Sequence, residues 1–294
     1  MKNFSNIPPI WKGNVAGDFL SGNPHGLTRE NISAIVFTDT LNGMPATAWD
    51  SSASTGRIMA WTLPAEDDMY TLYVGAEGGI NAHDCYQMFR GYTEAKTIRF
   101  NGCFHTEYTT DMSELFFGCR NLTELDLSSF NTSNVTELFS TFHGCSGLTS
   151  LDLSNFDTAN VFNMYCTFAN CHSLTKLDLS SFDTSNVSYI SGMFYKCSSL
   201  TAIDLSRFHI QDISDVSFMF YECKNLVELD LSGFNSSKIT NASYMFYDCS
   251  NLSRLNLSGF KTVPTADTSC MFKNCGNLTE LNFPGYDLES AKKL

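Results

Sequence analysis

The sequence predicts an α/β repeat protein in which each unit adds one short strand to a parallel sheet. Two regularities predict this fold class. Seven cysteines recur at one constant interval, and each has a phenylalanine three positions before it and a leucine three positions after it. Seven thiols in equivalent surroundings indicate a buried structural column and not a reactive or metal-binding site. The seven are Cys119, Cys145, Cys171, Cys197, Cys223, Cys249 and Cys275.

The strand of each unit is visible in "CSGLTSLDLSNFDTANVFNMYCTFAN", which begins at Cys145. Leu151, Asp152 and Leu153 alternate between apolar and polar, as a strand with one buried face requires. Positions 1, 4, 6 and 9 of this leucine-rich pattern are Leu148, Leu151, Leu153 and Phe156. We therefore expect a short strand at the same place in every unit, in parallel with its neighbouring copies.

The second half of the unit is predicted to turn the chain and bring it back. "FDTAN" and its counterparts "FNTSN" and "FDTSN" supply Asx and Ser/Thr side chains that bond local backbone groups. Val161, Met164, Thr167 and Phe168 then follow at i, i+3, i+6 and i+7, a spacing typical of a helix. The complete prediction is a leucine-rich-repeat solenoid with a parallel β-sheet and short helical turns.

The chain divides into two predicted parts. Residues 1–85 contain all three tryptophans and are expected to form a small β-rich N-terminal capping module. Residues 86–294 are expected to form the solenoid, with Tyr92 in place of the cysteine in the first unit and Pro284 in place of the serine after the strand in the last. Such departures are expected at the ends of a repeat array, where the units cover an open core. The predicted strands of the module are residues 32–38, 57–62 and 69–74.

The repeat motifs resemble those of one known family. "LTELDLSSFNTSNV", "LTSLDLSNFDTANV" and "LTKLDLSSFDTSNV" are each followed by Phe-x-x-Cys. They are similar to the 26-residue units of BspA-like leucine-rich-repeat surface proteins of the Mycoplasma-lipoprotein type, over residues 88–286. The resemblance implies a leucine-rich solenoid, a cell-surface or extracellular location and a role in adhesion or recognition. It implies no chemistry. The turns at 209–213, 235–239 and 261–265 depart from the pattern.

The charge and hydropathy of the chain limit the classes of partner and the cellular locations to be expected. The net charge of −13 disfavours nucleic acid as a partner and favours basic or cationic ones. No stretch of about 18 apolar residues predicts insertion into a membrane. The first residues, "MKNFSNIPPIWKGNV", lack the apolar run of a signal peptide. A cytoplasmic or virion-associated location therefore stays open beside the cell surface.

The sequence contains no recognisable catalytic machinery. It lacks the glycine-rich phosphate-binding motifs, H-E-x-x-H and C-x-x-C. The six histidines share no ligand spacing, and the pairs Cys166 with Cys171 and Cys270 with Cys275 lack the further ligands that a zinc site requires. We expect no catalytic, cofactor-binding or metal-binding residues, no cofactor, and no enzymatic activity.

Two surface features are candidates for binding. An acidic row occupies the outward position of successive strands, continued by Asn256 and Asn282: Asp126, Asp152, Asp178, Asp204 and Asp230. Neighbouring carboxylates would repel one another, so we expect hydrogen bonds from Ser and Thr columns to offset the repulsion, with flanking cations or a bound divalent cation as alternatives. An aromatic group lies in the return segments, where it either binds a partner or packs along the flank: Tyr195, Tyr221, Tyr247, Phe218 and Tyr244.

The sequence therefore favours a non-enzymatic binding or adhesion protein that presents a solenoid surface to a protein or glycan on a host, cell or particle surface. An intracellular protein-interaction scaffold is one alternative. A phage tail or receptor-binding protein is another. The ligand and the oligomeric state are not predicted.

Overall fold

The structure is a computed structural model that describes residues 10–11, 19–51, 58–211, 213–235 and 238–291. Three features of the sequence fall partly outside these residues. They are residues 1–9 and 12–15 of the segment inspected for a signal peptide, Arg57 at the start of a predicted strand, and residues 212, 236 and 237 in two of the departing turns.

The N-terminal part contributes most of a six-stranded sheet in the order β3-β4-β5-β2-β7-β9. The predicted strand at residues 32–38 is confirmed, and the other two lie one or two residues later than predicted. Strand β4 is antiparallel to β3 and β5, and the other pairs are parallel. The strands are β2 (Ile32–Thr38), β3 (Trp49–Asp50), β4 (Met59–Pro64), β5 (Tyr70–Gly75), β7 (Thr97–Arg99) and β9 (Glu124–Leu125). Because β7 and β9 belong to the repeats, one sheet joins both parts of the chain.

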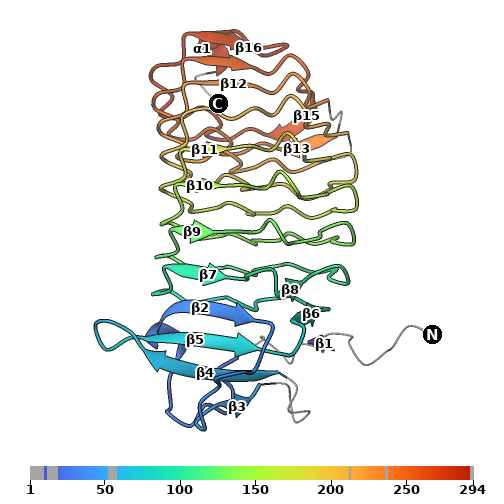
Figure 1. Cartoon of the computed structure of the whole chain (residues 1–294). Coiled ribbons are helices and arrows are strands. Elements are labelled where there is room, and N and C mark those ends of the chain that lie inside the picture. Colours follow the sequence, from blue (N-terminus) through green and yellow to red (C-terminus); the bar gives the residue numbers. More distant parts are fainter. Residues whose placement is uncertain (1–9, 12–18, 52–57, 212, 236–237, 292–294) are drawn as a thin grey trace, which may run out of the picture.

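The repeat units are stacked along one axis above this N-terminal part (Figure 1). Equivalent residues of successive units pair in register, as in the pairs Ser150↔Lys176 and Arg254↔Glu280. The strands of this side are β10 (Ser150–Leu151), β11 (Lys176–Leu177), β12 (Glu228–Asp230), β14 (Arg254–Asn256) and β16 (Glu280–Asn282). Other strands are β1 (Ile10–Trp11), β6 (Ile80–Ala82), β8 (Phe104–His105), β13 (Ile239–Asn241) and β15 (Thr262–Asp267). The parallel strand therefore lies where the alternating pattern predicts it in every unit but one, since residues 201–205 form no strand.

The predicted short helical turns are wrong. Among the described residues the only helices are a 3-10 helix at Arg29–Asn31 and α1 (Leu288–Ala291), both outside the predicted turns. In the unit used for the prediction, Cys166 and Asn170 have φ values of +54° and +60°, which no right-handed helix contains. The return segment is a series of tight turns. Its N–H groups bond the next unit, as from Phe168 to the Met193 carbonyl at 3.0 Å.

A stack of phenylalanine rings forms the centre of the core. Consecutive rings are 5.4 to 5.8 Å apart between centroids, with interplanar angles of 0 to 17°. The rings of this stack are Phe89, Phe116, Phe142, Phe168, Phe194, Phe220, Phe246 and Phe272. Phe19 and Phe37 contact its first ring and Phe283 contacts its last. Both ends of the stack are therefore covered by aromatic side chains.

The cysteine column is buried beside this stack and has a structural role. All eleven cysteines are free thiols, and the seven of the column are at most 3% exposed. Each thiol donates to the carbonyl of a phenylalanine in an earlier unit, as Cys197 does to Phe168 at 3.1 Å. The same carbonyl accepts the N–H of Cys171 at 3.3 Å, so the thiol occupies its second lone pair. Burial raises the pKa of the Cys171 thiol to about 12 and keeps it protonated.

Buried threonines join the corners of consecutive units. Thr158 donates its hydroxyl to the Asp183 carbonyl at 2.9 Å and accepts the Asp183 N–H at 2.8 Å. Thr132 and Thr184 make the same pair of bonds to the following units. The series ends where Ile210 takes the threonine position. The later turns therefore differ from the earlier ones, as predicted. In the later units the strands β13 and β15 pair with each other.

We predict that Cys197→Ala lowers the free energy of unfolding by about 1–2 kcal/mol, because it leaves a small cavity and removes one bond from the Phe168 carbonyl. Urea unfolding followed by circular dichroism measures the change. The control is Cys166→Ala, which alters a partly exposed thiol outside the column and should change stability by less than about 0.5 kcal/mol. Equal effects of the two variants would contradict the structural role of the column.

Candidate functional site

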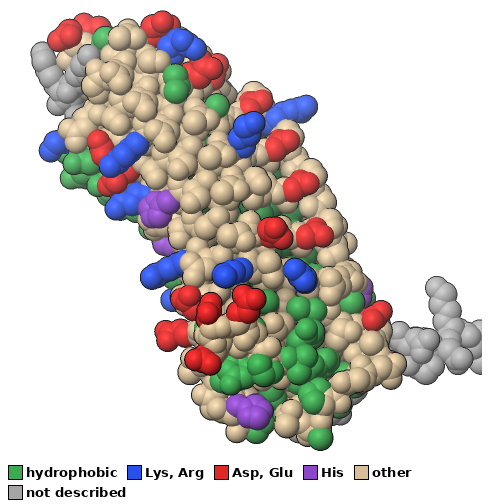
Figure 2. Space-filling view, turned by 60° about the vertical axis from the view of Figure 1, so that its left-hand side comes forward, with side chains coloured by type: hydrophobic (Ala, Val, Ile, Leu, Met, Phe, Trp, Pro, Cys, Tyr) green, Lys and Arg blue, Asp and Glu red, His purple; other side chains and the backbone are tan. Residues whose placement is uncertain are grey.

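The exposed face of the repeat sheet carries two parallel rows of side chains. They flank the inward leucine of each strand, since successive side chains of a strand point to opposite faces. One row is the predicted acidic row, which is exposed along its whole length. Figure 2 shows acidic side chains in a line along the repeat region, next to an apolar patch at the N-terminal end. The other row is mixed: Glu124, Ser150, Lys176, Ala202, Glu228, Arg254 and Glu280.

Hydrogen bonds within each unit hold the aspartates of the acidic row. Asp178 accepts the backbone N–H of Ser180 at 2.9 Å, and the other four aspartates make the same bond to the serine two positions later at 2.8 to 3.0 Å. These donors hold the pKa of the Asp178 carboxyl below its usual range. The expected bonds from the serine columns are therefore present, and they come from backbone N–H groups of the same unit, as from Ser128 to Asp126 and from Ser154 to Asp152.

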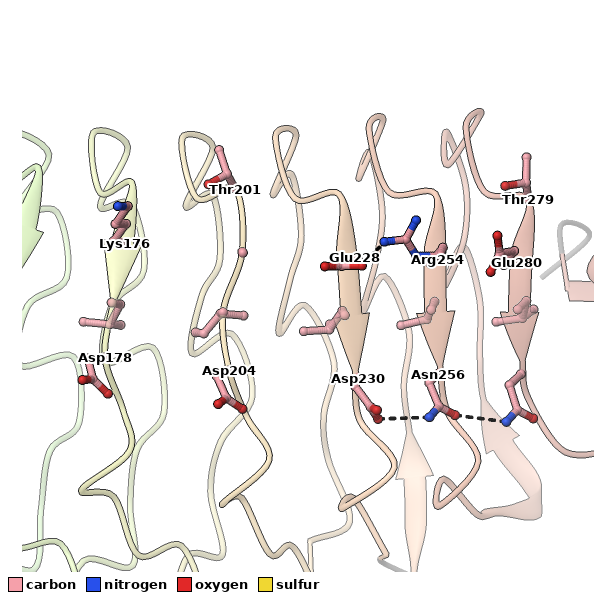
Figure 3. A pocket seen from close by; sticks show the side chains of 17 residues that line it. Lys176, Asp178, Thr201, Asp204, Glu228, Asp230, Arg254, Asn256, Thr279 and Glu280 are labelled. Atoms are coloured by element: carbon pink, nitrogen blue, oxygen red, sulfur yellow. Dashed lines mark hydrogen bonds and ion pairs between the residues drawn. The ribbon is translucent and has the colours of Figure 1, made fainter.

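Bonds between units begin where amides replace carboxylates. Asn256 donates to Asp230 at 3.1 Å and Asn282 donates to Asn256 at 3.1 Å (Figure 3). Two ionised carboxylates have no donor to share, whereas an amide has both a donor and an acceptor. The C-terminal end of the row is therefore a hydrogen-bonded ladder. In the rest of the row, each aspartate is held by a hydrogen bond within its own unit.

A groove of about 1110 Å³ lies on this face between β11 and β16. Its lining includes Asp178, Asp204 and Asp230 from the acidic row (Figure 3). Asp126 and Asp152 of the same row lie outside it. The structure thus divides the predicted acidic row, because Asp126 lines a separate, smaller pocket and Asp152 lines neither of the two.

The five predicted aromatic residues are brought together on the side of the return segments. The rings of Tyr195, Tyr221 and Tyr247 stack with centroids 4.8 Å apart and interplanar angles of 14° and 6°. Phe218 and Tyr244 form a second column, 5.0 Å apart at 4°. The two columns are in contact, with the Tyr244 and Tyr247 centroids 5.7 Å apart. We call these five residues the aromatic flank.

Four further aromatic residues of the return segments were not predicted. Tyr189, Tyr165 and Phe162 are 58%, 41% and 39% exposed, more than Phe218 at 37%. Phe139 stacks on Tyr165 at 5.5 Å. The sequence held a signal for this pair, because Phe139 and Tyr165 are separated by one repeat length and so occupy the same position of successive units.

Charged side chains border the aromatic flank. Lys196 lies 5.3 Å from the Tyr195 ring centroid and 3.6 Å from the Glu222 carboxylate. Lys224 pairs with Glu222 at 3.6 Å and with Asp248 at 3.2 Å. Lys273 lies 6.0 Å from the Tyr247 ring centroid, so side chains of both signs border the rings. Such mixed, exposed pairs contribute little stability and leave the rings as the main feature of the surface.

Neither a metal-binding cluster nor a membrane-spanning helix is found among the described residues. In the part of the chain that the structure describes, no cluster of three or more His, Cys, Asp or Glu side chains is arranged to hold a metal ion. No helix of the described residues is long and apolar enough to cross a bilayer.

Comparison with known proteins identifies the repeats. Residues 83–203 and 190–294 match the family described as Mycoplasma protein of unknown function, DUF285. The chain belongs to this family. The match confirms the resemblance to BspA-like repeats of the Mycoplasma type. The chain is also similar to a solved structure, a leucine rich cell surface protein from Faecalibacterium prausnitzii A2-165, with 14% identity and a TM-score of 0.30, over 81% of this chain and 95% of that one. No curated protein gave a significant match.

We predict that Asp178→Asn leaves stability near pH 7 unchanged or slightly higher, because the amide oxygen still accepts the Ser180 N–H while the repulsion from Asp152 and Asp204 is removed. The pKa of Asp178 is lowered in the folded protein, so its carboxylate stabilises the fold above about pH 4, and this contribution is lost as the pH falls through the folded pKa. The variant should therefore lose less stability than the wild type below about pH 4. Thermal melts from pH 7 to pH 2.5, with and without calcium and chelator, measure this. A large loss at pH 7, or a chelator-sensitive wild type, would contradict it.

Proposed function

We propose that this protein is a non-enzymatic binding protein, a leucine-rich-repeat solenoid located at the cell surface or outside the cell, and that it binds a protein partner through the aromatic flank. The observation that carries the proposal is the gathering of Tyr and Phe side chains on one side of the stack, where a surface would otherwise be polar. Tyrosine supplies a large contact area while losing little conformational freedom on binding.

The backbone of the aromatic flank supports a role beyond stability. Phe218 and Tyr244 each have a φ of +57°, in the left-handed region that favours glycine. Gly192 occupies the same position one unit earlier, with a φ of +64°. A bulky residue in this conformation costs on the order of 1 kcal/mol. Aromatic side chains at these two positions therefore reduce stability while they extend the exposed aromatic surface.

The orientation of the rings favours a protein over a glycan as the partner. Tyr195, Tyr221 and Tyr247 stack face to face, so each ring turns its face to a neighbour and its edge to solvent. Sugars are held by aromatic residues through the ring face, whereas ring edges and hydroxyl groups suit the carbonyls and side chains of a protein surface. The pKa of Tyr221 is raised to about 12, first by burial and then by Glu222, so its hydroxyl stays a donor at neutral pH.

The ionisable groups of the sheet face support a non-enzymatic function. A general acid requires a carboxyl whose pKa is raised towards neutrality. The pKa values of Asp152, Asp178 and Asp204 are lowered instead, chiefly by backbone hydrogen bonds. These carboxylates are arranged to remain charged and to bind, and they are poorly suited to transfer protons.

The proposed location is supported by the family resemblance. The intracellular scaffold and the phage tail or receptor-binding protein are the competing hypotheses. Protease shaving of intact source cells, with detection of the released peptides, distinguishes them. Release from intact cells supports the surface location, and peptides found only after lysis would refute it.

We predict that replacing Tyr195, Tyr221 and Tyr247 together by Ser weakens partner binding at least about tenfold, since central aromatic residues dominate the affinity of protein interfaces. The wild type is first tested against arrays of extracellular proteins and glycans, and the affinity of the bound ligand is then measured for both proteins. Melting curves provide the control for folding. Unchanged affinity, or selective binding of glycans by the wild type, would contradict the proposal.

A second variant separates binding from stability. We predict that Phe218→Asn changes the free energy of unfolding by less than about 1 kcal/mol, because relief of the left-handed strain offsets the loss of the stack on Tyr244. Partner binding should nevertheless fall. Phe220→Ala is the matched control: it empties a site in the core stack and should destabilise the protein by about 3 kcal/mol or more. A large loss of stability in Phe218→Asn would make Phe218 a structural residue.

A further inference from the structure

The groove on the sheet face coincides with an interruption of the parallel sheet. Residues 201–205, all described, form no strand, although they occupy the place between β11 and β12. Among the described residues, one backbone bond joins this segment to the next strand segment, from the Val227 N–H to the Thr201 carbonyl at 3.3 Å. The groove spans this interruption and continues to β16 (Figure 3).

The floor of the groove is apolar at the interruption. Ala202 is exposed at a position that Lys176, Glu228 and Arg254 occupy in neighbouring units, so a long side chain is missing there. The adjacent Ile203 is partly exposed, as Leu281 is at the far end of the groove, whereas Leu177 and Leu229 at the equivalent position are 7% and 4% exposed. The missing side chain and the partly uncovered isoleucine create a short apolar hollow.

The rim of this hollow is acidic. Five carboxylates and two cations line the groove, which gives a net charge of −3. One of the cations, Arg254, is already paired with Glu228. Asp178, Asp204 and Asp230 form the side of the groove next to the hollow, and each uses one carboxylate oxygen for its own serine N–H. All three carboxylates of this rim line the groove of about 1110 Å³.

We propose that the groove binds an extended segment of a polypeptide whose lysine or arginine side chains lie across it. Such a side chain has an apolar stem and a cationic end, and it matches a site with an apolar floor and a carboxylate rim. The stem would cover Ala202 and Ile203, and the cation would lie between Asp178, Asp204 and Asp230. The occupant is chosen by charge complementarity, which also speeds the encounter of a basic segment with this acidic protein.

The repeat also suits an extended chain. Carboxylates recur at the spacing of neighbouring strands, about 4.8 Å, and alternate side chains of an extended peptide recur at about 6.7 Å. Because lysine and arginine have long flexible stems, each cation can reach a carboxylate without an exact match of the two periods. This site is separate from the aromatic flank, which is formed by the return segments, and it does not depend on the proposed function of that flank.

The test uses fluorescence anisotropy with the full chain and a labelled peptide of alternating Lys and Thr, about ten residues long. The peptide should bind more weakly as salt increases, since the pairs formed are close to solvent. Asp204→Asn and Ala202→Arg should each weaken binding by at least about fivefold, the first by removing a rim charge and the second by filling the hollow with a cation.

Matched controls lie in the same rows outside the groove. Asp152→Asn removes an equivalent aspartate with the same serine bond, and Ser150→Arg adds the same cation to the same row. Both should change the affinity by less than about twofold. The triple tyrosine variant should bind the peptide as the wild type does, which distinguishes this site from the aromatic flank.

Several outcomes would overturn the proposal. No binding of the lysine peptide at low salt would do so, as would equal effects of Asp152→Asn and Asp204→Asn, which would show attraction by the overall charge alone. Binding of a Glu-Thr peptide with similar affinity would refute the charge argument. If spermine bound more tightly than a peptide of equal charge, the site would belong to free polyamines and not to a polypeptide.

Discussion

The structure depends on one constraint, the constant register in which equivalent residues of neighbouring units align. Two interactions inside the stack fix this register. One is the stacking of the phenylalanine rings, 5.4 to 5.8 Å apart, and the other is the hydrogen bond that each column cysteine thiol donates to a carbonyl of an earlier unit. Both require the same residue at the same place in every unit. A shift of one residue within a unit would break the bonds of this kind that the unit makes to its neighbours.

The register of the core also fixes the positions of the surface residues, whether or not their alignment is favourable. Once the core residues are aligned, residues at any other position of the unit must also stack at strand spacing. The aspartates of the sheet face are forced together in this way, and bonds to the serine N–H groups within each unit keep them ionised. The tyrosines of the flank are brought together by the same mechanism. There the stacking is favourable, because parallel aromatic rings attract one another.

The features that could be predicted from the sequence are those that depend only on the period. The buried cysteines, the strand at Leu151 and the contact of Tyr195 with Tyr221 all follow from residues separated by one repeat length. The helical turn was predicted wrongly because tight turns and a helix bury the same positions of the sequence. They differ in the sign of φ at Cys166 and Phe218, and at this position of the unit only Gly192 is the residue type that favours a positive φ.

The candidate sites show the same division. The sequence revealed the aspartate row and the aromatic flank, but not the groove, since the groove spans residues 201–205, which fail to pair as a strand. Whether a short segment pairs as a strand depends on the geometry of single backbone hydrogen bonds, which the amino-acid composition does not determine. The sequence shows that Ala202 stands where neighbouring units have a longer side chain. That this leaves a groove on the sheet face could be seen only from the structure.

Stacking also explains how such a chain can carry more than one binding surface. Each unit contacts only its neighbours, so a change at an exposed position alters the fold locally and leaves distant units unaffected. Phe218 and Ala202 belong to the same unit, the first in a return segment and the second on the sheet face. The strain at Phe218 reduces the stability of its own turns, and the hollow at Ala202 reduces pairing in its own strand segment. Neither change disturbs the phenylalanine stack between them, which is why a regular core is compatible with irregular and separately adjustable surfaces.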